Sequence, residues 1–328
     1  MSLFAIIQQI RFWDFGCRPL FTVIFVLAFL ICVTAQDEDK VVRVHTELAA
    51  FEVLVEDKDG KPVQGLTAKD FRVFESGVER KIDFFQPVSS GGKKRPLVIV
   101  FAVDVSGSMT AGEIEKLRNA INAFIERFGD YESYFSLISF AMEVERIQSF
   151  TNKPEHLKRA LAKLNRDQLG RSTHAFDAVD FSVRSIEKSM PKSLRGKEPK
   201  RAVIVVTDGF PVGDTVSPAT VIERANEAGA SVFSIILPSY SPTGRDTRPL
   251  MTLFEASGIV ERTGGSRLYA LDNNFEPIFQ ALAEEITASY AIAFYPEENY
   301  ATSKRSVRIE SKNGYRIKQN RTSYELKR

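Results

Sequence analysis

The chain has 328 residues, of which 44% are hydrophobic and 26% are charged, and its formal net charge is +2. This composition is that of a globular protein long enough to bury a large core in two or three domains. The small net charge gives no reason to expect a nucleic-acid partner. The three histidines, His45, His156 and His174, are scattered along the sequence, which argues against a zinc or iron site built on histidine.

Residues 1–35 have the features of a secretory signal peptide. A basic segment precedes an uncharged apolar run, 20–33, which ends in small residues before an acidic stretch. We expect cleavage after Ala35 and a secreted or periplasmic mature protein. The alternative is a retained N-terminal anchor, although the run is shorter than the ~20 residues that a membrane span needs. Both cysteines, Cys17 and Cys32, lie in this segment, so we expect a mature chain without disulfides or thiolate ligands.

Residues 36–92 are predicted to form a small β module. Apolar and polar residues alternate in its first part, which is typical of half-buried strands. Its Ser-, Gly- and Lys-rich end, 89–95, indicates a linker to the next part of the chain. The expected elements are strands within 41–56, a capped helical turn at 67–70, and a hairpin of strands 71–74 and 81–85 with Ser76 and Gly77 at its turn.

From Pro96 the pattern changes to alternating strands and helices. This alternation predicts an α/β domain over 96–289, with a doubly wound, mostly parallel sheet and helices on both faces. The expected strands are 96–104, 134–140, 144–150, 202–206, 231–237 and 267–270, of which the second and third form an edge hairpin. The expected helices are 113–128, 154–164, 173–189, 218–228, 250–263 and 275–289.

The tail, 290–328, returns to β structure. Strands at 306–310 and 315–318 flank Asn313 and Gly314, a typical signal for a type I′ hairpin. So short a ribbon cannot bury its own apolar side chains. We therefore expect the tail strands to pack on the 36–92 module in a smaller β-sandwich-like unit. The alternative is a tail that packs on the α/β domain.

Three loops of the α/β domain carry the polar residues that indicate function. A buried strand ends at Asp104 and is followed by Ser106 and Ser108, Thr173 opens a predicted helix, and Asp208 follows another buried strand. In such sheets ligands bind outside the carboxyl ends of the strands, so we expect the loops to converge. Two carboxylates and three hydroxyls suit Mg²⁺ or Mn²⁺. They also leave room for an acidic group from outside.

The three loops resemble the von Willebrand factor type A family. DVSGS at 104–108, a threonine within GRSTHAFDA at 170–178, and VTDG at 206–209 match its metal-ion-dependent adhesion site (MIDAS), which uses a DxSxS loop, a threonine and an aspartate in this order. The resemblance covers roughly 96–289. It implies that Mg²⁺ or Mn²⁺ is held, directly or through water, by five residues: Asp104, Ser106, Ser108, Thr173 and Asp208.

The resemblance carries further implications. Asp177 is expected to be structural rather than a ligand, and His174 departs from the small or polar residue common beside the threonine. The last helix, 275–289, is expected to shift as the site opens. Segments 65–77 and 290–296 are similar to bacterial secreted "VWFA-related" proteins, which extends the resemblance beyond the α/β domain.

The function implied is that of a secreted or periplasmic protein-binding, adhesion-type module that grips a partner's Asp or Glu through the metal. Loops 130–133, 209–216 and 238–249 would set specificity. Catalysis is not indicated: Ser106 stands where dehalogenase-type phosphatases have a second aspartate, and the sequence has no GxSxG or Walker loop. The alternative is a structural or assembly protein of the cell envelope that uses the fold without metal-dependent binding.

Overall fold

The protein is described by a computed structural model that places most of the chain from residue 48 onward. The described residues are 48–90, 93–107, 110–128, 132–164, 173–237, 251–271, 274–297 and 304–325. The predicted signal segment, Ser108, and the loop 238–249 lie outside these ranges. Within them, no helix is long and apolar enough to span a membrane.

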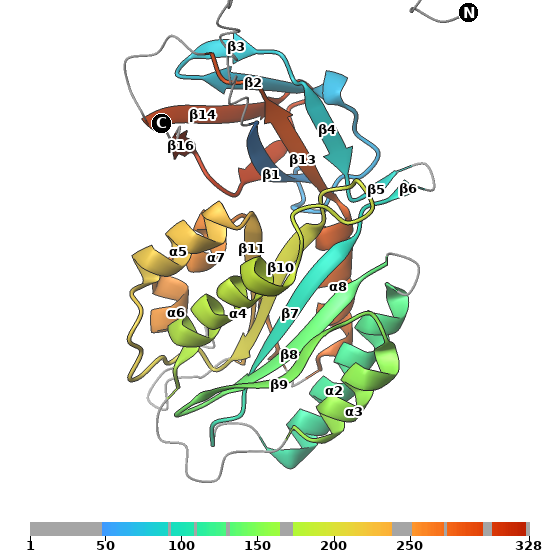
Figure 1. The fold of residues 1–328 in the computed structure, drawn as a ribbon, viewed down its shortest axis with the longest axis vertical. Helices are drawn as coiled ribbons and strands as arrows, with labels where there is room; N and C mark the ends of the chain where they lie inside the picture. Colours follow the sequence, from blue (N-terminus) through green and yellow to red (C-terminus); the bar gives the residue numbers. More distant parts are fainter. Residues whose placement is uncertain are drawn as a thin grey trace, which may run out of the picture. The chain divides into compact units, whose positions relative to one another are not determined.

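The α/β part is built on a six-stranded sheet with the order β12-β11-β10-β7-β8-β9 (Figure 1). All neighbours are parallel except β8 and β9, which form the predicted antiparallel hairpin at one edge. The predicted α/β class is therefore confirmed. The strands are β7 Leu97–Asp104, β8 Tyr134–Phe140, β9 Val144–Thr151, β10 Lys200–Thr207, β11 Ala230–Ile236 and β12 Arg267–Tyr269.

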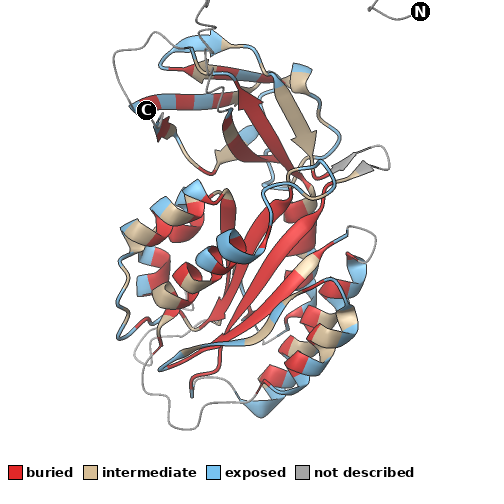
Figure 2. Cartoon of the chain, in the orientation of Figure 1, coloured by how far each residue is buried: buried red, intermediate tan, exposed pale blue. Residues whose placement is uncertain are grey.

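Helices cover both faces of this sheet. One apolar core lies between the sheet and α2, α3 and α8, and the other lies between the sheet and α4 to α7. Strands β7 and β10 are buried along their whole length, as Figure 2 shows, which explains why they are almost continuously apolar. The helices are α2 Ala111–Arg127, α3 Pro154–Ala162, α4 Ala175–Ser189, α5 Pro218–Glu227, α6 Leu253–Ala256, α7 Ile259–Arg262 and α8 Glu276–Thr287.

The prediction of a single helix over 250–263 is wrong, because the segment forms two short helices. Helix α6 ends at Ala256 and α7 begins at Ile259. Between them Gly258 has φ +69°, a left-handed conformation that glycine adopts easily and that interrupts a helix. The apolar spacing continues across the break, so periodicity alone could not reveal it.

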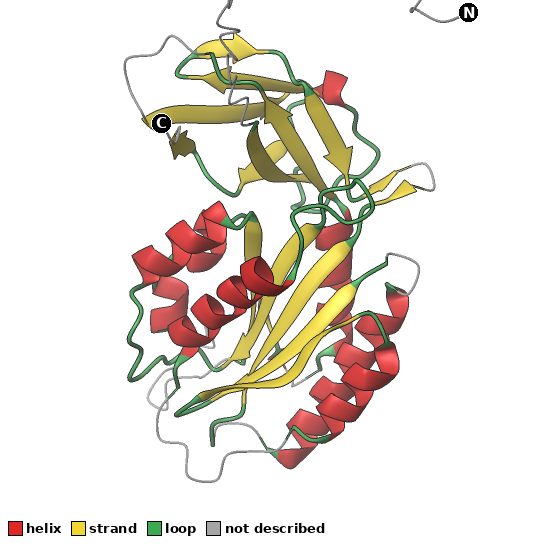
Figure 3. Ribbon diagram, in the orientation of Figure 1, coloured by secondary structure: helices red, strands yellow, loops and turns green. Residues whose placement is uncertain are grey.

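Eight further strands form two four-stranded antiparallel sheets, ordered β15-β1-β13-β4 and β16-β14-β2-β3. Figure 3 shows strands in yellow and the helices of the α/β part in red. Apolar side chains of both sheets share one core. Strands from the two ends of the chain thus lie side by side, which confirms this part of the predicted fold class. The strands are β1 Ala49–Glu56, β2 Phe71–Glu75, β3 Val78–Arg80, β4 Phe84–Pro87, β13 Ser289–Phe294, β14 Lys304–Ser311, β15 Arg316–Gln319 and β16 Ser323–Glu325.

Both predicted hairpins of this β unit need correction. Strand β2 turns at Ser76 and Gly77, which have φ of 47° and 86°, but it pairs with β3 rather than with 81–85; β4 joins β13 in the other sheet. In the tail, β14 pairs with β2 and β16, whereas β15 pairs with β1. Only Gly314 of the Asn-Gly pair has positive φ (74°), so the type I′ turn is absent. Because β14 and β15 lie in different sheets, apolar side chains of both strands face the core between the sheets.

The predicted helical turn is confirmed as η1, Ala68–Asp70. Thr67 caps it, and its backbone N–H donates to the Asp70 carboxylate at 2.8 Å. The predicted linker contains a short two-stranded ladder of β5 Ser89–Ser90 and β6 Lys93–Lys94.

A buried cluster of charged side chains connects β1 to the α/β sheet. Glu52 of β1 contacts Arg95 at 2.6 Å and Lys200, the first residue of β10, at 3.3 Å. Arg95 also donates to the carbonyl oxygen of Glu198 at 2.6 Å, and Lys200 donates to Ser231 Oγ at 2.8 Å. All three charged side chains are buried, so each charge depends on the others for compensation.

Candidate metal centre

Asp104 is the last residue of β7, and its side chain is fully buried. One carboxylate oxygen accepts the Ser106 backbone N–H at 2.9 Å, and the other accepts the Thr207 hydroxyl at 2.8 Å. Burial raises the pKa of Asp104, and the negative charge of Asp208 adds to this, while hydrogen bonds from Ser106 and Thr207 oppose it. A buried carboxylate whose neighbours are neutral donors and a second carboxylate favours a cation as a further partner.

The loop after β10 brings Asp208 to the same edge of the sheet. Thr207 donates its hydroxyl to Asp104 and accepts the Gly209 N–H at 3.0 Å, so β7 and this loop are joined through one side chain. Asp208 accepts the Phe210 N–H at 3.2 Å. Thr207 was not among the predicted site residues; its place before the aspartate in VTDG was the only signal of its role.

Thr173 lies against the same loop. Its backbone N–H donates to the Val212 carbonyl at 3.2 Å, and the Val212 N–H donates back at 2.9 Å. The next residue, His174, donates its N–H to the Ala141 carbonyl at 3.0 Å, just beyond the end of β8. The Thr173 segment is therefore held between the loops that follow β8 and β10.

The structure thus places Asp104, Thr173 and Asp208 in loops linked by hydrogen bonds at the carboxyl ends of parallel strands. Ser106 is buried beside Asp104, and Ser108 lies outside the described residues. In the described ranges, no three Asp, Glu, His or Cys side chains are grouped so that they could hold a metal ion; the predicted set contains only two carboxylates. The oxygen donors present fit a hard cation such as Mg²⁺ or Mn²⁺.

Large apolar side chains are exposed around this edge. Of ten such side chains in the described part of the chain, six follow the carboxyl end of a strand of the α/β sheet or lie at the start of α6. Helix α6 belongs to this edge because the Phe254 N–H donates to the Gly209 carbonyl at 3.1 Å. The six residues are Met142, Phe210, Val212, Met251, Leu253 and Leu271. We call them the apolar rim.

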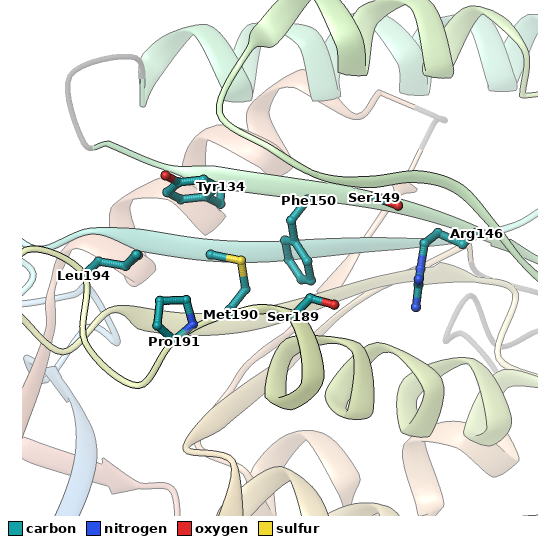
Figure 4. A pocket seen from close by; sticks show the side chains of 8 residues that line it. All are labelled: Tyr134, Arg146, Ser149, Phe150, Ser189, Met190, Pro191 and Leu194. Carbon is teal, nitrogen blue, oxygen red and sulfur yellow. The ribbon is translucent and has the colours of Figure 1, made fainter.

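A cavity of about 340 Å³ lies elsewhere, between the β8–β9 edge and the end of α4 (Figure 4). Tyr134, the first residue of β8, and Met190, just after α4, are among its lining residues. Because β8 runs parallel to β7, the start of β8 lies at the amino ends of the strands, whereas Asp104 lies at their carboxyl ends. None of the predicted ligands lines this cavity.

Comparison with known proteins supports the assignment of the fold. The family model of the von Willebrand factor type A domain matches residues 99–260. Inter-alpha-trypsin inhibitor heavy chain H4 from Sus scrofa is 25% identical over 133 residues, which are 40% of this chain and 14% of that protein. Integrin alpha-X from Homo sapiens is 25% identical over 142 residues, 42% of this chain and 12% of that protein. The chain therefore matches only about one seventh of the length of these relatives.

Solved structures are also similar to part of the chain. An aerotolerance-related membrane protein from Bacteroides fragilis has 19% sequence identity and a TM-score of 0.43, covering 58% of this chain and 98% of that one. Proximal thread matrix protein 1 from the mussel byssus, with a zinc-occupied MIDAS motif, has 15% identity and a TM-score of 0.47, covering 62% and 49%. From the family match and the sheet topology, residues 99–260 form a von Willebrand factor type A domain.

Proposed function

We propose that this protein is a secreted or periplasmic, metal-ion-dependent protein-binding module. Its ligand would be an Asp or Glu side chain of a partner protein, bound to Mg²⁺ or Mn²⁺ at a MIDAS formed by Asp104, Ser106, Ser108, Thr173 and Asp208. The observation that carries the proposal is the buried Asp104 carboxylate, which is linked through Thr207 to the loop of Asp208.

The chemistry of these residues suits a metal site that is open to an external ligand rather than a closed structural site. Mg²⁺ takes octahedral oxygen coordination and keeps some positions for water or substrate. Hydroxyls are neutral donors, so a metal held by them and two carboxylates retains Lewis acidity. A carboxylate from outside can then replace water on the ion. The protein's own task would be to hold the oxygen donors at the sheet edge, which β7 and β10 do by their burial.

The apolar rim supports a protein as the partner. Interface cores are depleted of charge and rich in Met and aromatic residues, and the rim includes two methionines and a phenylalanine. Phe210 and Val212 follow Asp208 on the same loop. A partner segment with apolar residues beside its acidic residue would cover them.

The organisation of the chain forms part of the proposal. We take residues 1–35 as a cleaved signal peptide, 36–92 as the N-terminal β module, 96–289 as the domain that binds the ligand, and 290–328 as the C-terminal strands of the β unit. Helix α8 is separated from β13 by Ala288 alone. A shift of α8 on ligand binding would therefore act directly on the central part of a β sheet.

A partner pull-down with the purified protein tests this function. Binding is expected in Mg²⁺ and is expected to be lost in EDTA and in Asp104→Ala. Asp59→Ala, which changes an exposed carboxylate in a turn of the β unit, is the matched control and should bind like the wild type. Calorimetric titration with Mn²⁺ should show one site in the wild type and none in Asp104→Ala. Binding that is unaffected by EDTA and by Asp104→Ala would overturn the proposed metal-dependent binding and favour a structural role without metal.

A further inference from the structure

We propose that Asp177 and Asp214 form a reciprocal carboxylate clamp that holds the Thr173 segment against the loop after Asp208. The clamp would make both aspartates positioning residues for the metal site, and to that extent it rests on the function proposed above. Neither residue is a predicted ligand.

Asp177 lies in the first turn of α4, one turn after Thr173, and binds the far end of the Asp208 loop. One of its oxygens accepts the N–H groups of Val216 at 2.8 Å and Thr215 at 3.0 Å, and also the Thr215 hydroxyl at 3.1 Å. Its other oxygen lies 3.2 Å from His174 Nδ1. These donors lower the pKa of Asp177 although its partial burial opposes the charge. The surroundings of Asp177 therefore stabilise the charged form of its carboxylate.

Asp214 acts in the opposite direction, from the loop onto the helix. Its Oδ1 accepts the Asp177 backbone N–H at 2.8 Å. The first N–H groups of a helix have no partner within the helix, and the residue at the N-cap of α4, His174, provides no side-chain cap. Asp214 supplies that cap from a different loop. Each aspartate therefore satisfies backbone donors of the segment that carries the other.

The clamp closes a ring with the backbone bridge between Thr173 and Val212. The bridge joins the two segments next to the ligand-bearing residues, and the clamp joins them again four residues further along α4 and two to four residues further along the loop. Two linkages fix both the distance and the direction of one segment relative to the other. Outer residues that orient metal ligands in this way typically contribute 10–100-fold to metal affinity.

Asp180 provides a matched control on the same helix. It is fully buried, lies one turn after Asp177, and pairs with Arg184 at 2.9 Å and Arg224 at 2.6 Å, on α4 and α5. These contacts hold α4 against α5 rather than against the loop after β10. Asp180→Asn should lower stability without loosening the two site segments.

The first measurement is amide hydrogen exchange of Thr173 and Val212 in the metal-free protein. Asp177→Asn replaces one acceptor oxygen with a donor group, and Asp214→Ala removes the acceptor of the Asp177 N–H. Both are expected to speed exchange of these two amides at least ~10-fold relative to the wild type, while Asp180→Asn leaves them protected. Unchanged exchange in Asp177→Asn and Asp214→Ala would overturn the clamp, whether or not the protein binds metal.

The second measurement is Mn²⁺ affinity by calorimetry. We expect roughly 10–100-fold weaker binding in Asp177→Asn and wild-type affinity in Asp180→Asn. Equal Mn²⁺ affinity in the wild type and Asp177→Asn would overturn the positioning role and leave the proposed function intact. A wild type that binds no Mn²⁺ would overturn the proposed function and, with it, the positioning role.

Discussion

Asp104 shows at the scale of one residue how the site differs from an ordinary core position. Its backbone continues a buried parallel strand, and its carboxylate is fully buried with neutral hydrogen-bond donors. Burial raises the pKa of this carboxyl, and nearby Asp208 raises it further. The charged form of Asp104 therefore costs stability when no cation is bound.

Asp104→Asn is expected to raise the Tm of the protein in EDTA at pH 7. Because the folded-state pKa of Asp104 is raised, the penalty is present above that pKa and disappears below the unfolded-state value of ~3.9. Relief of about 1 kcal/mol would raise the Tm by about 2–4 °C, and the difference should vanish near pH 3.5. Scanning calorimetry across pH checks this.

The same variant has an opposite expectation with metal present. Saturating Mn²⁺ should raise the Tm of the wild type, because a ligand that binds only the folded state stabilises it, and should leave Asp104→Asn unchanged. A lower Tm of Asp104→Asn in EDTA at pH 7 would contradict the proposed cost of the buried charge.

At the scale of an element, the loop after β10 is held by its contact with α6. Gly209 has φ +82°, and a Cβ atom at this position would lie 2.4 Å from Thr252 Oγ1. Thr252 in turn caps α6 by accepting the Glu255 N–H at 3.2 Å. The glycine is needed both for its backbone conformation and for this close approach.

Gly209→Ala should destabilise the protein by about 1–3 kcal/mol, from backbone strain and overpacking, and should weaken Mn²⁺ binding because Asp208 is adjacent. Urea unfolding and calorimetry provide the two readouts. The control is Gly112→Ala in α2, where an added Cβ would have no neighbour within 4 Å; it should leave stability unchanged or raise it by up to ~1 kcal/mol. Equal effects of the two substitutions would argue against the close contact with Thr252.

At the scale of the whole described unit, the buried cluster of Glu52, Arg95 and Lys200 connects the β unit with the α/β sheet. Burial opposes the charge on Glu52, but Arg95 and Lys200 outweigh it and hold the pKa of Glu52 below its usual value. The alternation of apolar and polar residues in β1 is typical of a half-buried strand, yet Glu52 and Glu56 are both buried. Strand β1 has one side in the apolar core and the other among charged partners.

Glu52→Gln should lower the free energy of unfolding by about 3 kcal/mol at pH 7, since two buried cations lose their counter-charge. Because the folded-state pKa of Glu52 is lowered, its contribution is present above the unfolded-state pKa of ~4.3 and is lost as the pH falls through the folded value. The difference from the wild type should therefore shrink below pH 4. Urea unfolding checks this, with Glu79→Gln on the exposed side of β3 as the control. A loss as small as that of the control would show that Arg95 and Lys200 do not depend on Glu52.

Strand pairing in the β unit was the main feature that sequence patterns could not predict. A two-residue period shows which side chains share a face, but it does not say which sheet a strand joins. Val307 and Ile317 both turn toward one core from strands in different sheets, and a local hairpin would have buried less apolar surface. Similarly, α6 and α7 share one apolar spacing across the break at Gly258.

The sequence by itself determined the α/β class, because continuous apolar strands alternate with amphipathic helices, and it identified the loops of Asp104, Thr173 and Asp208. Order along the chain was enough for this, since parallel strands bring their carboxyl ends to one edge. Only the tertiary structure decided how those loops are joined. Thr207 bonds Asp104, and Asp177 and Asp214 bond each other's segments, across 103, 37 and 39 residues of sequence. Contacts so distant along the chain leave no local pattern, because they depend on where the completed sheet places each loop.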